Sequence, residues 1–258
     1  MNARTRNGRN ALVLALGLAA ATGCDAEALS VVELSAYGEE FVEDQIPASE
    51  FVDGWKVEFS RFVVALTDIE VDGEPLPGSF AVDLRENSQG AGHFLGEVLV
   101  PAGARPQITY RVAPLPDSGL MPDPSASIIV EGRAQRGNET ISFAWTFDTD
   151  TRYVECESVA ELHPEHAAQS ELTLHADHLF YDDLEAPDPN LTFDAIAAAD
   201  ADGNGEVTLS ELHAVDISAA ARYQGGGGQI TDLGAFVTAL TQTLGHIDGE
   251  GHCEIGAS

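Results

Sequence analysis

The chain has 258 residues, and its 43 Asp and Glu residues outnumber its 12 Lys and Arg residues, which gives a formal net charge of −31. This charge excludes nucleic acid and anionic membrane surfaces as partners, because both require basic segments and Lys56 is the only lysine. Hydrophobic residues make up 44% of the chain, a fraction typical of folded globular proteins and sufficient for a core that needs no framework of disulfides.

Residues 1–23 have the features of an export signal. Three arginines and no acidic residue precede residue 11, and residues 11–21 form an apolar run too short to cross a bilayer, which takes about 20 residues. Residues 21–24 then read Ala-Thr-Gly-Cys. This segment resembles the lipobox of bacterial lipoproteins, whose cysteine becomes the lipid-modified first residue of the mature protein. The resemblance implies a lipid anchor on Cys24, and cleavage without lipidation and an uncleaved anchor are the alternatives.

The three cysteines agree with this interpretation. Exported proteins commonly pair their cysteines, and an odd number leaves one without a partner unless another reaction consumes it. Lipidation of Cys24 leaves Cys156 and Cys253, which we expect to form a disulfide bond. The expected location is the cell envelope, on the outer membrane or the periplasmic face, with the protein held to the membrane by its lipid anchor.

Residues 31–184, preceded by a linker over residues 24–30, have the pattern of a β-rich domain. Apolar residues recur mainly at every second position, and clusters of Gly, Pro, Asp and Asn separate the runs. The predicted strands cover residues 31–36, 55–71, 79–84, 94–100, 107–112, 127–134, 140–147 and 171–175. The second of these is expected to break or bend near residues 65–67. Short strands without intervening helices indicate an antiparallel β-sandwich.

Three segments, residues 82–84 (Val-Asp-Leu), 100–103 (Val-Pro-Ala-Gly) and 110–112 (Tyr-Arg-Val), resemble in their order β-sandwich regions of other bacterial lipoproteins. The resemblance implies the same fold. Separately, we expect four aromatic side chains in the core of the sandwich, those of Trp55, Tyr110, Trp145 and Phe147. A place on the surface, where such aromatics bind sugars, is the alternative.

After residue 184 the apolar period changes from that of strands to that of helices. Helices are predicted over residues 191–199, 209–222 and 233–244. We expect residues 185–258 to form a small helical domain, so that the fold class of the whole chain is α+β.

Residues 200–211 read Asp-Ala-Asp-Gly-Asn-Gly-Glu-Val-Thr-Leu-Ser-Glu. This segment resembles the calcium-binding loop of the EF-hand family at each position that coordination requires. The resemblance implies one Ca²⁺ bound through oxygen atoms of Asp200, Asp202, Asn204, Glu206, Thr208 and Glu211. In that pattern Glu206 contributes its backbone carbonyl and Glu211 a bidentate carboxylate, and Gly205 allows the sharp turn. An acidic turn that binds no metal is the alternative.

A single loop of this kind favours a structural role for the ion. Val207 is the apolar residue expected to tie the loop to a partner strand or to the core, and residues 230–252 are expected to act as a degenerate partner that binds no metal. A Ca²⁺ sensor needs a helix pair that opens onto a groove, often rich in methionine. Met121 is the only methionine outside the signal segment, and the expected disulfide would oppose opening.

Histidines occur in three close pairs, His163 with His166, His175 with His178, and His246 with His252. The spacing within the first two pairs suits ligands of copper or zinc, so a periplasmic copper-binding protein is the alternative function. In the last predicted strand, Leu172 and Leu174 are expected to pack inward, which would turn Thr173 and His175 toward solvent. This alternation favours ordinary surface histidines.

The sequence contains no Gly-x-Ser-x-Gly and no His-Glu-x-x-His motif, so we expect no enzyme activity, and a hydrolase that uses paired acids is a remote alternative. The expected function is that of a calcium-binding exported lipoprotein. Its sandwich is expected to act as a binding or interaction module for a protein or a glycan, and Ca²⁺ is its expected cofactor.

Overall fold

The computed structural model of the chain describes residues 28–257, except residues 117, 221 and 224–229. The predicted signal segment and Cys24 lie outside the described residues. The strands are β1 (Leu29–Tyr37), β2 (Lys56–Val71), β3 (Glu74–Pro75), β4 (Phe80–Asp83), β5 (His93–Pro101), β6 (Gln107–Val112), β7 (Ile128–Arg136), β8 (Glu139–Phe147), β9 (Thr151–Glu157), β10 (Ala168–Leu174), β11 (Glu206–Thr208), β12 (Gly245–Ile247) and β13 (Glu254–Ile255). The helices are α1 (Glu39–Glu43), α2 (Asp194–Ala197), α3 (Leu209–Leu212) and α4 (Leu233–Leu240), with 3₁₀-helices η1 (Ala176–Phe180) and η2 (Thr241–Thr243).

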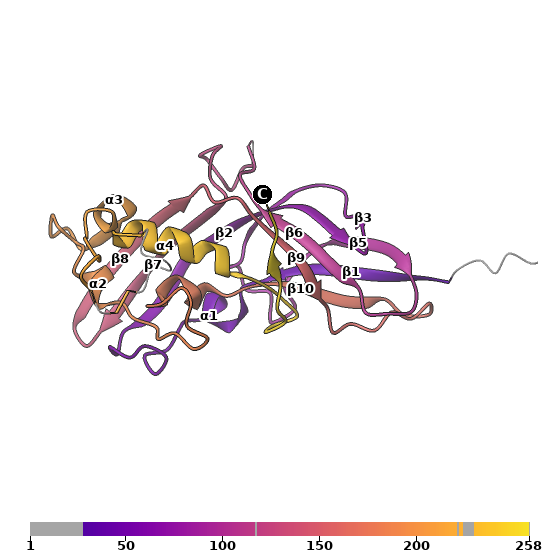
Figure 1. Cartoon of the computed structure of the whole chain (residues 1–258), viewed down its shortest axis with the longest axis horizontal. Coiled ribbons are helices and arrows are strands. Elements are labelled where there is room, and N and C mark those ends of the chain that lie inside the picture. Colours follow the sequence, from indigo (N-terminus) through magenta and orange to yellow (C-terminus); the bar gives the residue numbers. More distant parts are fainter. Residues whose placement is uncertain (1–27, 117, 221, 224–229, 258) are drawn as a thin grey trace, which may run out of the picture.

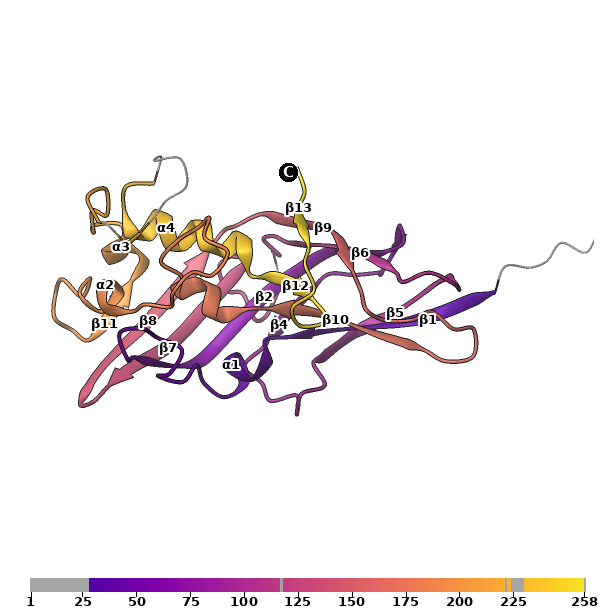
Figure 2. The ribbon, with the colours of Figure 1, turned by 60° about the horizontal axis from the view of Figure 1, so that its bottom comes forward.

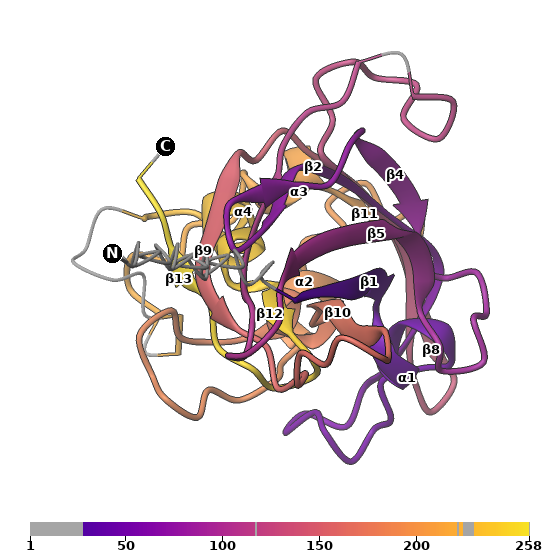
Figure 3. The ribbon, with the colours of Figure 1, turned by 90° about the vertical axis from the view of Figure 1, so that its right-hand side faces the viewer.

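The strands form two mixed sheets (Figures 1 and 3). One has the order β12-β10-β1-β5. The other has the order β11-β8-β7-β2-β6-β9-β13, with β3 and β4 also paired to β2. Most neighbours run antiparallel, but β1 pairs with β10 and β11 pairs with β8 in parallel. The prediction of a sheet-rich fold is therefore confirmed, although the sheets are not wholly antiparallel.

β2 is the long central strand of the larger sheet, and it stays a single strand where a break or bend is predicted. Its register against β6 shifts between Thr67 and Glu70, and Asp68 between them adopts a φ of 48°. A bulge therefore bends β2 close to the predicted place. Val63 and Ala65 pack in a second, small hydrophobic cluster apart from the main core, so part of β2 is covered on both faces.

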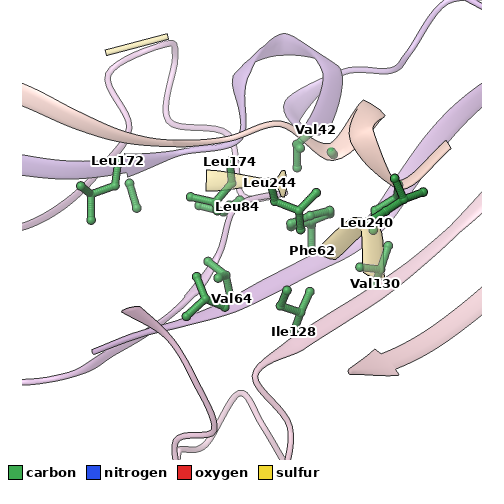
Figure 4. Close-up of a cluster of buried hydrophobic side chains, with 14 of the residues drawn as sticks. Val42, Phe62, Val64, Leu84, Ile128, Val130, Leu172, Leu174, Leu240 and Leu244 are labelled. Carbon is green, nitrogen blue, oxygen red and sulfur yellow. The ribbon is translucent and has the colours of Figure 1, made fainter. Parts of the chain in front are cut away.

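The main core joins the two sheets to the C-terminal part of the chain. Figure 4 shows side chains from several elements gathered together, namely Phe62 and Val64 of β2, Ile128 and Val130 of β7, Leu172 and Leu174 of β10, and Leu240 and Leu244 of the C-terminal segment. The predicted core aromatics are confirmed as buried, with at most 2% exposure for Trp55, Tyr110, Trp145 and Phe147. Burial of a large apolar side chain contributes about 1.5–3 kcal/mol, so this shared core holds the parts together.

Three strands of the segment after residue 184 extend the sheets: β11 joins β8, β12 joins β10, and β13 joins β9. Cys253, just before β13, forms the predicted disulfide bond with Cys156 of β9. Figure 2 shows β13 beside β9 near the C-terminal end. The bond links residues 97 positions apart and fastens this end of the chain to the larger sheet.

The helices of the C-terminal segment are shorter than the sequence predicts. α2 and α3 cover four residues each, and α3 ends at Leu212, where a helix to residue 222 is expected. The chain turns instead into an antiparallel bridge between Asp216 and Asp232, and the Asp232 side chain caps the start of α4. None of the helices within the described ranges is long and apolar enough to span a bilayer.

Candidate functional site

The predicted calcium loop runs from α2 through β11 to α3, at the end of the molecule away from β1 and β5 (Figures 1 and 2). Ile196 and Ala199 before the loop and Leu212 after it are buried, with at most 3% exposure. These side chains anchor both ends of the loop in the main core. Asp202 and Asn204 in its middle are exposed, so the centre of the loop is open to ions from solvent.

Asp200, Asp202 and Glu211 bring their carboxylates together. Each offers one oxygen atom, and the three oxygens lie within 4.8 Å of one another. Oxygen atoms bound to one Ca²⁺ at about 2.3–2.6 Å are at most about twice that distance apart. The three carboxylates therefore fit around a single calcium ion, and their charge favours a divalent cation.

Backbone amides of the turn hold Asp200 in place. Its Oδ1 accepts hydrogen bonds from the N–H groups of Gly203 and Asn204, and its Oδ2 accepts one from that of Gly205, at 2.9–3.1 Å. Gly203 and Gly205 adopt φ values of 72° and 83°, in the left-handed region that side chains disfavour. A Cβ added at either position would meet nothing within 4 Å, so the need for glycine is conformational.

Asn204 lies beside the carboxylate cluster. Its backbone N–H and its side-chain amide donate to Oδ1 and Oδ2 of Asp202 at 3.0 and 3.1 Å. Its own Oδ1 accepts a hydrogen bond from the N–H of Glu206 at 2.7 Å, and the Glu206 side chain is exposed. The backbone at Glu206 is thereby tied to the same turn that carries the carboxylates.

Glu211 reaches back from α3 to the start of the loop. Its Oε2 accepts hydrogen bonds from the N–H and the hydroxyl of Thr208, both at 2.9 Å, and its Oε1 accepts one from the N–H of Ala201 at 3.2 Å. The Thr208 hydroxyl oxygen in turn accepts from the Glu211 N–H, which completes a capping box at the start of α3. These bonds favour the ionised form and lower the pKa of Glu211 below its usual value.

Val207 fixes the loop to the larger sheet. β11 runs parallel to β8, with Val207 opposite Phe143. Val207 is fully buried, and its carbonyl accepts a hydrogen bond from Nε1 of Trp145 at 3.0 Å. The strand partner of Val207 is therefore β8. Residues 230–252 lie at a different face of the loop segment, where α4 contacts α3.

The structure also brings three histidines together. His175, at the end of β10, is 5% exposed and Thr173 is fully buried, so the prediction that both face solvent is wrong. The reason is that the turn after β12 covers this part of β10. The Gly249 N–H donates to Oγ1 of Thr173 at 2.9 Å, and the Gly249 carbonyl oxygen lies 3.1 Å from Nε2 of His175. The rings of His175, His178 and His246 have centroids 4.4–5.3 Å apart.

The remaining paired histidines, His163, His166 and His252, are exposed. Burial, with a contribution from neighbouring histidines, lowers the pKa of His178 to about 4 and that of His246 to about 3. Both imidazoles are therefore neutral at neutral pH, and each can offer a nitrogen lone pair to an ion.

A scan against family models and searches of curated proteins and solved structures found no match to this chain. Function is therefore inferred from the chemistry of the sites, because a sheet-rich fold by itself does not identify one.

Proposed function

We propose that this is an exported Ca²⁺-binding protein, in which Asp200, Asp202, Asn204, Glu206, Thr208 and Glu211 hold one calcium ion. The observation that carries the proposal is the convergence of three carboxylate oxygens within 4.8 Å, in a loop whose residue types match the EF-hand pattern. Three carboxylates with a neutral Asn204 suit moderate affinity. Extracellular modules of this kind bind Ca²⁺ at about 10⁻⁴ to 10⁻³ M.

The role proposed for the ion is structural. β11 covers part of β8, which would otherwise be an edge strand with unpaired backbone groups. An ion that pulls Asp200 and Glu211 together holds both ends of β11 and so keeps Val207 in the core. The disulfide of Cys253 fastens the same C-terminal segment at a second place, which opposes the opening that a sensor requires.

Lipid anchoring through Cys24 is part of the proposal. The Cys156–Cys253 disulfide uses two of the three cysteines, and disulfides persist in oxidising compartments outside the cytosol. Metabolic labelling with a fatty acid in a bacterial host tests the anchor. Label on the wild-type protein and none on the Cys24→Ser variant supports it, and equal labelling of the two contradicts it.

We further propose that the two sheets form a sandwich that serves as an interaction module. The shared core of the two sheets supports the sandwich arrangement. Phe94 and Val159 are 65% and 61% exposed and border a hollow of about 390 Å³ that Glu33, Glu171 and Asp248 also line. A glycan array probed with the wild type and with Phe94→Ser tests whether this surface recognises sugars, and a signal that the substitution removes would support it.

Thermal unfolding with and without Ca²⁺ tests the calcium proposal. An ion at a hundredfold excess over its Kd stabilises the folded state by about 2.7 kcal/mol, which in a protein of this size corresponds to a rise in Tm of about 5–10 °C. Glu211→Gln should remove the rise. Glu206→Gln is the matched control, because that exposed side chain is not an expected ligand, and it should keep the rise.

A further inference from the structure

A second group of metal-ligating side chains lies around η1, formed by residues other than those of the calcium loop. His175 follows β10, Asp177 and His178 belong to η1, and Glu39 begins α1. His175, Asp177 and His178 each offer one ligand atom, and these atoms lie within 4.8 Å of one another. The Glu39 Oε2 lies 3.7 Å from the Nδ1 of His175. The fold thus adds a carboxylate from α1, next to His175, to a cluster of two imidazoles and one carboxylate.

Asp177 contains an oxygen atom that needs a partner. Its Oδ1 is buried and has no hydrogen-bond partner among the described residues. The Nδ1 of His175 lies 4.0 Å from this oxygen, beyond hydrogen-bond distance. Its other oxygen, Oδ2, accepts a hydrogen bond from the Tyr181 hydroxyl at 3.5 Å. A buried carboxylate oxygen without a partner is costly, so a cation at this position would stabilise the folded state.

Backbone carbonyls determine which ring nitrogen of each imidazole carries the hydrogen. The Nδ1 of His178 lies 2.7 Å from the Thr243 carbonyl oxygen, and the Nε2 of His175 lies 3.1 Å from that of Gly249. A carbonyl only accepts, so each of these ring nitrogens carries the hydrogen. In a neutral ring the lone pair then resides on the opposite nitrogen, Nε2 of His178 and Nδ1 of His175. Metal-binding histidines are commonly oriented in this way.

We propose that Nδ1 of His175, Nε2 of His178 and a carboxylate oxygen of Asp177 bind one divalent transition-metal ion of the zinc and copper class, with Glu39 as the fourth ligand. Imidazole nitrogen suits zinc and copper, whereas Ca²⁺ prefers an all-oxygen shell. This site is therefore chemically distinct from the calcium loop.

The distances suit such an ion after small movements of the side chains. Bonds of about 2.0–2.1 Å in a tetrahedral zinc site place ligand atoms about 3.3–3.4 Å apart. The Nδ1 of His175 lies 3.7 Å from the Glu39 oxygen and 4.0 Å from the Asp177 oxygen. Binding therefore requires rotation of the Glu39 side chain, which is 26% exposed, and a shift of Asp177 and His178, whose ligand atoms lie within 4.8 Å of each other and of that of His175.

The cluster also has an approach from solvent. His178 and His246 line a groove of about 720 Å³ that Tyr181, Glu250 and His252 also border. The Nδ1 of His246 is buried and has no hydrogen-bond partner in the described part of the chain. Its ring is tilted against that of His175, with the two centroids 4.4 Å apart, so it is placed to assist an ion that enters by the groove.

The chain provides its own matched control. His163 and His166 have the same spacing as His175 and His178, and both pairs have an acidic residue in third place, but the first pair is exposed. The experiment titrates Zn²⁺ into Ca²⁺-saturated protein by calorimetry in competition with a zinc chelator. The double variant His175→Gln/His178→Gln should bind Zn²⁺ at least about a hundredfold more weakly than the wild type. The double variant His163→Gln/His166→Gln should bind like the wild type.

Equal Zn²⁺ affinity in the wild type and in the His175→Gln/His178→Gln variant would overturn the proposal, as would the absence of Zn²⁺ binding to the wild type. A parallel titration with Cu²⁺, monitored by visible absorption, gives the affinity for copper. The metal with the higher affinity is the one that the site prefers. Glu211→Gln should leave Zn²⁺ binding unchanged, so failure of the calcium proposal and failure of this one are distinguishable.

If the buried histidine variant does not fold, Asp177→Asn decides the question. It keeps the shape of the side chain and removes the unpartnered buried charge. Without metal its Tm should equal or exceed that of the wild type, while its Zn²⁺ affinity should fall at least about tenfold. Unchanged Zn²⁺ affinity in this folded variant would contradict a ligand role for Asp177 and with it the site.

Discussion

The indole Nε1 of Trp145 donates a hydrogen bond to the backbone carbonyl of Val207 at 3.0 Å. Trp145 belongs to β8 and is 1% exposed, and Val207 stands in the proposed calcium loop and is fully buried. This hydrogen bond connects the backbone of the loop to an aromatic side chain of the core. Any change of the loop on binding an ion should alter the surroundings of this indole.

Tryptophan fluorescence should therefore report on Ca²⁺. The chain has two tryptophans, so Trp55→Phe leaves Trp145 as the single emitter. Addition of Ca²⁺ to this variant should change its emission intensity or wavelength, with saturation at the same concentration as Ca²⁺ binding. The further substitution Glu211→Gln should abolish the change. An emission change that persists in that double variant would show that Trp145 does not sense the proposed site.

Loss of the disulfide should destabilise the protein without preventing Ca²⁺ binding. The bond between Cys156 and Cys253 closes a span of 97 residues, and an entropy model assigns about 4–5 kcal/mol to a loop of this length. Cys253→Ser should lower the free energy of unfolding in urea by that order. We expect little change in Ca²⁺ affinity, because the loop is held mainly by its own residues and by β8. A fall in Ca²⁺ affinity of more than about tenfold in this variant would contradict that explanation.

The side chain of Asp248 should contribute strongly to the stability of the fold. Its Oδ1 accepts from the Ser170 hydroxyl and the Glu171 N–H at 2.9 and 2.7 Å, and its Oδ2 accepts from the Ser158 hydroxyl and the Val159 N–H at 2.6 and 2.8 Å. Asp248→Asn replaces an acceptor by a donor at one side of this network. We expect a loss of about 2–4 kcal/mol in the free energy of unfolding, measured by urea denaturation. A loss below about 0.5 kcal/mol would show that the network rearranges.

Glu171 should make stability fall between acid and neutral pH. Burial, followed by repulsion from Asp248, Glu39, Glu40 and Glu43, raises its pKa from 4.5 to about 7. Below pH 4.5 the carboxyl group is protonated in both the folded and the unfolded state, so it does not reduce the stability of the folded state. As pH rises to about 7 the folded state keeps its proton longer than the unfolded state, so stability declines through this window.

The substitution Glu171→Gln tests this sign. The variant should have a higher Tm than the wild type at pH 8, and the difference should disappear below pH 4.5. A variant less stable than the wild type at pH 8 would show that the ionised Glu171 makes a favourable contact in the folded protein.

The features of the structure that can be predicted from the sequence are those that depend on local residue patterns. The alternation in β2 and β8 is local, and so is the motif of the proposed calcium loop, so both strands can be predicted from the sequence to within a few residues, and the loop can be proposed from it. β9 is not among the predicted strands, because a bulge interrupts the alternation of buried and exposed residues. Glu155 in the bulge has a φ of 54°, and the buried Tyr153 and Cys156 on either side of it are three positions apart instead of two.

Pairings between distant segments account for what could not be predicted. The loop motif shows that Val207 needs a partner, but only the fold identifies β8. Alternation predicts that His175 faces solvent, yet the turn after β12 covers it, with the Gly249 carbonyl oxygen 3.1 Å from its Nε2. The contribution of Glu39 from α1 has no local signal at all, because it depends on how α1 packs near η1.

Calorimetric titration of the purified protein with Ca²⁺ tests the central claim most directly. The proposed loop predicts one site per chain with a Kd at or below about 10⁻³ M, retained by Glu206→Gln and lost in Glu211→Gln. A wild-type protein that takes up no Ca²⁺ at millimolar concentrations, or a Glu211→Gln variant that binds as the wild type does, would contradict it.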